Sequence, residues 1–195
     1  HFAYNNGTLF AEQVDVHGIV EEFGSPVYVY SARTLRERLA AMRGHFAAID
    51  PLICYSVKSC SNLSILKLLV DAGAGLDVVS GGELFRALKV GTAPEKIVFA
   101  GVGKSAEDIR YAVEVGVFLF NVESEPELAR IDAIAREAGK QVQVAIRVNP
   151  DVADADTPEK TSTGGRQTKF GIPLERAHVL YQPGRFANVK VTGVH

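Results

Sequence analysis

The sequence comprises 195 residues, of which 47% are hydrophobic and 23% charged, and its 21 Lys and Arg against 23 Asp and Glu leave a net charge of −2. This composition is typical of a folded globular protein and argues against a disordered or collagen-like chain. The near-neutral charge offers no broad basic surface, so we expect no nucleic-acid partner. The apolar runs are well below the roughly 20 residues of a membrane span, and no basic segment precedes an apolar one at the N-terminus. We therefore expect a cytoplasmic protein without a membrane partner.

The first 30 residues differ in pattern from the rest of the chain. Short apolar segments at 2–4 and 8–10 flank Asn5-Asn6-Gly7, which is typical of a hairpin turn. We assign residues 1–30 to the start of a separate β-rich domain. The apolar run 26–30 predicts a further strand, and Ser31 is the predicted N-cap of a helix over 31–48.

From residue 53 onward, apolar strands alternate with amphipathic helices. The predicted strands are 53–58, 76–80, 97–100, 118–122, 142–148 and 189–195, and the predicted helices are 62–72, 82–90, 106–115, 126–138 and 174–181. Continuous apolar strands covered by helices indicate a parallel sheet buried on both faces. This repeat fits either a doubly wound sheet or a (β/α)8 TIM-type barrel, and spacing does not separate the two.

Four of these strands carry one ionisable residue each: Lys58, Asp77, Arg147 and His195. An unpaired polar group inside a buried strand costs several kcal/mol, so its presence calls for a reason. Each residue alone is more often structural, but four at corresponding strand ends favour a site on the catalytic face of a barrel. Strand alternation places Cys54, Ser56 and Lys58 on one face. A desolvated lysine near other cations could attack a carbonyl to form an imine.

Three other patterns give weaker signals. Residues 100–105 resemble the end of a phosphate-binding loop, but Val98 replaces the first glycine, so a tight turn and a Ser105 helix cap are favoured. Residues 80–83 open a helix whose N–H groups could face an anion, although capping alone explains them more simply. Cys54 and Cys60 are read as free thiols, too few for a zinc site, and no metal is expected.

A long polar connection over 151–171 follows the strand that carries Arg147. Connections of this length within a compact domain are uncommon and tend to be functional or disordered. We interpret it as a substrate-facing loop or lid, with a plain surface insertion as the alternative. The residues that we assign to a substrate loop are Ser162, Thr163, Gly164, Lys169 and Phe170.

Several segments together resemble a known family. The matching stretches are 55–62, 73–84, 121–124, 147–150, 162–164 with 169–172, and 193–195, and they cover nearly the whole chain in order. In these stretches the sequence is similar to the pyridoxal-phosphate-dependent decarboxylases built on an alanine-racemase-like barrel (fold type III), and among them to the diaminopimelate decarboxylases. It departs from them around the lysine, at Ser56, Ser59 and Cys60, and in the turn at 100–103.

The resemblance implies pyridoxal 5'-phosphate as cofactor, held by Lys58 as a Schiff base, with Asp77 beside it. Arg147 would belong to the hydrogen-bonding shell of the site, and His195 would stack on the pyridine ring. The implied reaction is decarboxylation of meso-2,6-diaminopimelate to L-lysine by a homodimeric enzyme. Alternatives that stay open are an ornithine- or arginine-type decarboxylase of the same family, a noncatalytic pyridoxal-phosphate-binding barrel, and a purely structural βα fragment.

The number of predicted strands bears on the extent of the domain. An eight-stranded barrel takes about 250 residues, and only six barrel strands are predicted within 31–195. We therefore expect an incomplete (β/α) barrel, with the β-rich segment 1–30 in front of it. We also expect the sequence to be the N-terminal part of a longer enzyme and to be inactive by itself, with its phosphate-binding and partner-subunit residues lying beyond it.

Overall fold

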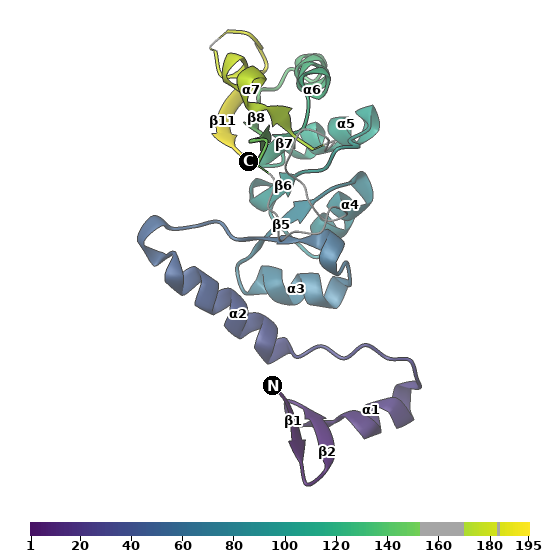
Figure 1. Cartoon of the computed structure of the whole chain (residues 1–195). Helices are drawn as coiled ribbons and strands as arrows, with labels where there is room; N and C mark the ends of the chain where they lie inside the picture. Colours follow the sequence, from purple (N-terminus) through teal and green to yellow (C-terminus); the bar gives the residue numbers. More distant parts are fainter. Residues whose placement is uncertain (153–169, 183) are drawn as a thin grey trace.

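The computed structural model describes residues 1–152, 170–182 and 184–195, and its main body is a six-stranded parallel sheet (Figure 1). The spatial order of the strands is β11-β8-β7-β6-β5-β4. Their bounds are β4 Cys54–Ser56, β5 Gly75–Val78, β6 Ile97–Phe99, β7 Leu119–Val122, β8 Val142–Ile146 and β11 Val189–Val194. The predicted parallel sheet is thereby confirmed.

The strand order also separates the two architectures that the sequence left open. A doubly wound sheet reverses its strand order at a switch point. Here the six strands follow one another in space as they do along the chain, without a reversal. That order is the one of a (β/α) barrel, in which each strand is added beside the previous one.

Helices follow the strands and cover the sheet (Figure 1). Their bounds are α2 Ala32–His45, α3 Leu63–Asp71, α4 Gly81–Lys89, α5 Ala106–Val115, α6 Glu125–Glu137 and α7 Leu174–Leu180, with short 3-10 turns η1 Ala47–Ile49, η2 Val57–Ser59 and η3 Pro94–Lys96. A second, two-stranded parallel sheet pairs β9 Val148–Asn149 with β10 Ile172–Pro173. None of the described helices is long and apolar enough to cross a membrane.

Apolar side chains from strands and helices form one main core. Phe99 and Phe120 from neighbouring strands are fully buried and stack with ring centroids 6.0 Å apart. Leu84 of α4, Ile109 of α5 and Leu128 of α6 are also fully buried against this sheet. Burial of such side chains contributes about 1.5–3 kcal/mol each relative to exposure. The core therefore stabilises the strands whose carboxyl ends carry the ionisable side chains.

Three helices in succession begin with the same capping arrangement at the carboxyl end of a strand. In each, a serine hydroxyl accepts a backbone N–H three residues later, and the acidic residue there accepts a backbone N–H from the chain entering the helix. The pairs are Ser80 with Glu83, Ser105 with Asp108, and Ser124 with Glu127. The predicted Ser105 cap is confirmed, as is the Ser31 cap of α2.

The N-terminal unit is a small antiparallel sheet of β1 Phe2–Asn5, β2 Thr8–Ala11 and β3 Val14–Asp15, followed by α1 Val16–Phe23. The predicted hairpin is confirmed, since Asn6 and Gly7 both have positive φ, at 49° and 82°. Figure 1 shows this unit separated from the large sheet by α2. Glu12 joins it to α2 by accepting from Ser31 Oγ (2.7 Å) and the Arg33 N–H (2.8 Å).

Two predicted strands are corrected by the structure. Residues 26–30 form no strand, because no described strand lies beside them to pair with, and Tyr28 is 86% exposed. The strand predicted over 53–58 ends at Ser56, and Val57–Ser59 turns into η2. The prediction that Lys58 shares a strand face with Cys54 and Ser56 is therefore wrong.

Candidate functional site

Ionisable side chains gather where the parallel strands end. Parallel strands present their carboxyl ends at one edge of the sheet, so residues that end or follow them become neighbours. Six ionisable residues of the described chain lie there: the sequence predicts four of them as site residues and does not predict Lys104 and Glu123. The six are Lys58 after β4, Asp77 in β5, Lys104 after β6, Glu123 after β7, Arg147 after β8 and His195 after β11.

Lys58 lies on the η2 turn directly after β4. The turn is closed by the Ser59 hydroxyl, which donates to the Ser56 carbonyl oxygen at 2.5 Å. Its apolar neighbour Val57 is fully buried, which anchors the turn, while Lys58 is exposed. Within the described chain the Lys58 ammonium makes no hydrogen bond or ion pair. Its amine is therefore available to a ligand at this edge.

Asp77 pairs in register with Ser56 across β4 and β5. Asp77 Oδ1 and Ser56 Oγ are buried and have no hydrogen-bond partner among the described residues. Burial raises the pKa of Asp77, while the neighbouring Ser56 hydroxyl and the positive charges of Lys58, His195 and Lys104 act in the opposite direction. A carboxylate with an unused oxygen in this setting favours a polar ligand beside it.

Cys54, at the start of β4, is a free thiol close to Asp77. Burial and the negative charge of Asp77 raise its pKa to about 11. The thiol is thus protonated at neutral pH and unreactive, because the thiolate is the nucleophilic form. The described residues contain no group of three or more His, Cys, Asp or Glu that could hold a metal ion.

Arg147 and Glu123 form an ion pair at the ends of β8 and β7. Arg147 Nη1 lies 2.8 Å from Glu123 Oε1, and Glu123 Oε2 accepts the Gly171 N–H at 3.1 Å. The Phe170 ring faces the guanidinium, 4.8 Å from its carbon to the ring centroid. The Glu123 side chain is only 4% exposed. Both Glu123 oxygens are thereby engaged, one by Arg147 and the other by the end of the 151–171 connection.

Of the predicted substrate-loop residues, the structure places Phe170 against Arg147. Ser162, Thr163, Gly164 and Lys169 lie outside the described residues. The described contacts between this connection and the carboxyl edge include those of Phe170 with Arg147 and of Gly171 with Glu123.

His195 lies beside Arg147 at the end of β11. Its N–H donates to the Ile146 carbonyl and its own carbonyl accepts the Val148 N–H, both at 2.9 Å. These two bonds fix the residue between β8 and β9. Burial lowers the pKa of His195, as does the positive charge of Arg147, although Glu123 and Asp77 oppose this. The lowered pKa favours the neutral form of the imidazole.

Lys104 is the second lysine of this edge, and its environment is the opposite of that of Lys58. Its side chain is 0% exposed, and Nζ donates to the carbonyl oxygens of Gly101 and Asn121, each at 2.7 Å, and to Glu127 Oε1 at 2.6 Å. An ammonium has three N–H donors, so all of them are used by the protein. This arrangement leaves no donor for a phosphate, which agrees with the rejection of a phosphate-binding loop over 100–105.

The helix-capping interpretation of residues 80–83 is also supported. The Gly81 N–H donates to Asp108 Oδ1 at 2.8 Å and the Val79 N–H to Glu83 Oε2 at 2.9 Å. These N–H groups are satisfied by carboxylates of the chain itself.

Lys104 and Glu123 are absent from the predicted site residues, because only ionisable side chains within the predicted strands are used to predict the site. Both follow a strand, Glu123 immediately after β7 and Lys104 in the glycine-containing turn after β6. A charged residue directly after an apolar strand is the signal that could have identified Glu123, and a lysine in the glycine-containing turn after a strand is the signal for Lys104. Their pairing with Arg147 and Glu127 could not be read from either signal, because it depends on neighbouring βα units.

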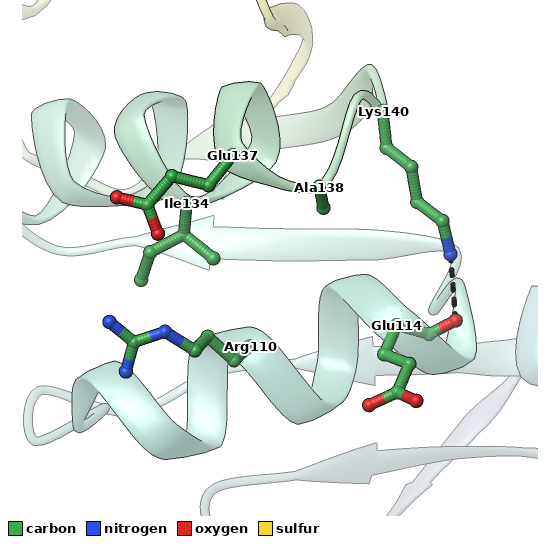
Figure 2. Close-up of a pocket in the computed structure, with 6 residues that line it drawn as sticks. All are labelled: Arg110, Glu114, Ile134, Glu137, Ala138 and Lys140. Carbon is green, nitrogen blue, oxygen red and sulfur yellow. Dashed lines mark hydrogen bonds between the residues drawn. The ribbon is translucent and has the colours of Figure 1, made fainter.

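A groove between α5 and α6 lies on the helical layer, away from these residues (Figure 2). It is lined by Arg110, Glu114, Ile134, Glu137, Ala138 and Lys140. Lys140 Nζ donates to the carbonyl oxygens of Val113 (3.0 Å) and Glu114 (2.7 Å) at the last turn of α5. A cation at a helix C-terminus is a stabilising contact, so we interpret this groove as structural.

The described residues thus form a barrel-type α/β domain with charged groups at its carboxyl edge, where Lys58 is exposed, and this arrangement is compatible with a cofactor-binding α/β domain. Residues 32–195 match the family described as "Pyridoxal-dependent decarboxylase, pyridoxal binding domain". The chain belongs to this family.

Curated relatives include the diaminopimelate decarboxylase of Pseudomonas aeruginosa, 45% identical over 99% of this chain and 46% of that protein, and that of Aquifex aeolicus, 43% identical over 100% of this chain and 46% of that protein. Among solved structures, a diaminopimelate decarboxylase of M. jannaschii in complex with L-lysine is similar with a TM-score of 0.89 and 33% identity, covering 100% of this chain and 46% of that one. The chain thus spans about half the length of these relatives.

The residues of the carboxyl edge fit pyridoxal phosphate in two respects. A Schiff base to an aldehyde requires a lysine amine that is not already bound by the protein, and Lys58 meets this condition whereas Lys104 does not. Ser56 Oγ and Asp77 Oδ1 lack partners among the described residues and can be satisfied by a polar ligand. The donor set is thus compatible with this cofactor.

Proposed function

We propose that this chain is the cofactor-binding part of a pyridoxal-phosphate-dependent decarboxylase that converts meso-2,6-diaminopimelate to L-lysine and CO₂. The observation that carries the proposal is the identity of 40–45% to diaminopimelate decarboxylases along nearly the whole chain. Two solved relatives of that name, from Helicobacter pylori and M. jannaschii, are in complex with L-lysine. That ligand is the expected product.

In this proposal Lys58 holds the cofactor covalently through Nζ. Among the described residues its amine is bound by no protein oxygen, whereas burial and three acceptors hold Lys104 in place. Bound pyridoxal phosphate would supply an electron-accepting ring for the electron pair left on the substrate Cα when CO₂ departs.

The other predicted residues position and tune this site. His195 is assigned to the face of the ring, and its lowered pKa favours the neutral imidazole there. Arg147 contributes a guanidinium whose direction is set by Glu123 and by the Phe170 ring. Asp77 lies beside Lys58 and His195, close enough for their charges to act on its carboxylate. Ser162, Thr163, Gly164, Lys169 and Phe170 are assigned to the substrate side of the site.

We extend the proposal to the organisation of the whole protein. Residues 1–30 belong to a separate β domain and residues 31–195 to the barrel, which is supported by the separate N-terminal sheet β1-β2-β3. The intact enzyme is a cytoplasmic homodimer that carries its remaining cofactor and substrate contacts on the rest of its chain. Analytical ultracentrifugation of the full-length protein tests the dimer.

The full-length protein provides the test of the reaction. It is incubated with pyridoxal phosphate, reduced with borohydride and digested, and the modified lysine is located by mass spectrometry. We expect the label on Lys58 and none on Lys104. CO₂ release is then compared for meso-2,6-diaminopimelate, ornithine and arginine, with the first expected to be fastest.

Each contrary outcome has a definite meaning. A label on another lysine overturns the role of Lys58. Faster turnover of ornithine or arginine overturns the substrate assignment. Labelling of Lys58 without CO₂ release from any of the three indicates a noncatalytic cofactor-binding barrel.

A further inference from the structure

A continuous series of contacts runs from the turn after β6 to the end of β8. Lys104 Nζ donates to Glu127 Oε1 at 2.6 Å, and Glu127 Oε2 accepts the Glu123 backbone N–H at 2.8 Å. The Glu123 side chain in turn binds Arg147 Nη1 at 2.8 Å and the Gly171 N–H at 3.1 Å. The two oxygens of Glu127 therefore connect a buried lysine with the backbone of the residue that orients Arg147.

Burial makes these contacts strong and directional. The side chains of Lys104, Glu127 and Glu123 are 0%, 10% and 4% exposed, so water competes little for their charges. The Lys104 ammonium also holds the carbonyl oxygen of Asn121, which lies two residues before Glu123 on β7. The end of β7 is thus bound through two backbone groups, the Asn121 carbonyl by Lys104 and the Glu123 N–H by Glu127. A shift of Lys104 or Glu127 would turn the Glu123 carboxylate relative to Arg147.

Helix α5 offers an internal comparison. Asp108 is the corresponding capping acid, and it also reaches back to the preceding βα unit, where Oδ1 accepts the Gly81 N–H at 2.8 Å. This contact ends on a backbone amide at the start of α4. Asp108 thus caps its helix as Glu127 does, but its described contacts include no lysine and no connection to Glu123 or Arg147.

We infer that Lys104 and Glu127 are positioning residues, which hold Glu123 and through it Arg147 and Gly171 in the geometry that the active site requires. This inference rests on the proposed function for its catalytic consequence. Its structural part, that a change at Glu127 alters the hydrogen bond of Glu123 with Gly171, does not depend on that function.

The test uses the full-length protein and the variant Glu127→Gln, with Asp108→Asn as the matched control. Hydrogen exchange followed by mass spectrometry is measured first on the protein without cofactor. For Glu127→Gln we expect faster exchange in the peptides that contain Glu123 and Gly171. For Asp108→Asn we expect faster exchange only around Gly81.

Steady-state kinetics with meso-2,6-diaminopimelate and saturating cofactor form the second measurement. A misplacement of about 1 Å, caused by a mutation away from the reacting groups, can cost about 10²-fold in rate. We therefore expect Glu127→Gln to lower kcat by about 10- to 100-fold, with a smaller change in KM, and Asp108→Asn to keep the wild-type kcat. The double variant Lys104→Met/Glu127→Gln is expected to lose no more than the worse single variant, because the two residues act as one unit.

Three results would overturn the inference. These are unchanged exchange at Gly171 in Glu127→Gln, an equal fall of kcat in Asp108→Asn, and independent, multiplicative losses in the double variant. If Glu127→Gln does not fold, Glu127→Asp keeps the charge, shortens the reach by one methylene, and is expected to give the same pattern at smaller amplitude. Absence of decarboxylation by the wild type would refute the proposed function alone, since the exchange experiment needs no turnover.

Discussion

The two halves of the carboxyl edge differ in how their charges are satisfied. At β6, β7 and β8, Lys104, Glu127, Glu123 and Arg147 are linked to one another in an unbroken series. At β4 and β5, Lys58 is exposed and makes no hydrogen bond or ion pair with the described residues, and two buried oxygens, Ser56 Oγ and Asp77 Oδ1, have no hydrogen-bond partner among them.

This difference indicates that the two halves of the sheet edge have different roles. A half whose polar groups are all bound to each other is rigid and already in its final arrangement. A half with unsatisfied polar groups is costly until a ligand binds them. We therefore interpret β6–β8 as the support of the site and β4–β5 as the part that receives the cofactor.

The largest expected effect separates the function of the two lysines. Lys58→Ala should lower kcat of the full-length enzyme by at least about 10³-fold, since it removes the amine proposed to hold the cofactor. Its free energy of unfolding should change by less than about 0.5 kcal/mol, because the side chain is exposed. Lys67→Ala, at another exposed lysine, is the activity control. Retention of most activity by Lys58→Ala would contradict the proposal that Lys58 holds the cofactor.

The second effect is on stability. Lys104→Met should lower the free energy of unfolding by about 3 kcal/mol, because it leaves Glu127 and two carbonyl oxygens buried without their cation. Urea denaturation of the protein without cofactor measures the change. Lys58→Met is the matched variant and should stay within about 0.5 kcal/mol of the wild type. Equal stability losses at both positions would contradict the division into a support and a receiving half.

A smaller effect is expected from a helix cap on the supporting half. Ser105→Ala removes the hydroxyl that accepts the Asp108 N–H at 3.1 Å and should cost about 1 kcal/mol. Ser64→Ala, in an exposed position that makes no side-chain cap, should be close to neutral. Differential scanning calorimetry of both variants provides the measurement. A neutral Ser105→Ala would show that the capping box is redundant with the packing of α5.

The smallest effect concerns pH on the receiving half. Burial raises the pKa of Asp77 in the folded protein, so the folded state binds its proton more tightly than the unfolded state does. The stability contributed by this group is therefore present below its unfolded pKa of about 3.9 and is lost as pH rises through the raised folded pKa.

Asp77→Asn removes that dependence. The variant should match the wild type near pH 3.5 and become more stable than it as pH rises, with a constant difference once the Asp77 carboxyl is fully ionised. Thermal denaturation between pH 3.5 and 7, without cofactor, follows the difference. Parallel curves over the whole range would show that the folded state does not disfavour the Asp77 carboxylate.

The sequence determined the local elements of this protein. Helix periodicity, the capping residues Ser31 and Ser105 and the Asn6-Gly7 turn act over a few residues, and the structure has these elements close to the predicted bounds. The alternation of apolar strands and helices likewise predicted the parallel sheet. The resemblance to pyridoxal-phosphate decarboxylases agrees with the family that residues 32–195 match.

Only the tertiary structure decided which polar groups are paired. Lys58 and Lys104 both follow a strand, yet Lys104 forms an ion pair with Glu127 of the next βα unit. Lys58 makes no hydrogen bond or ion pair with the described residues, although Asp77 of the next unit lies near it. Residues 26–30 have the composition of a strand but pair with no strand of the described chain. Hydrogen bonds and ion pairs between βα units depend on how distant segments meet in space, and no local periodicity encodes that meeting.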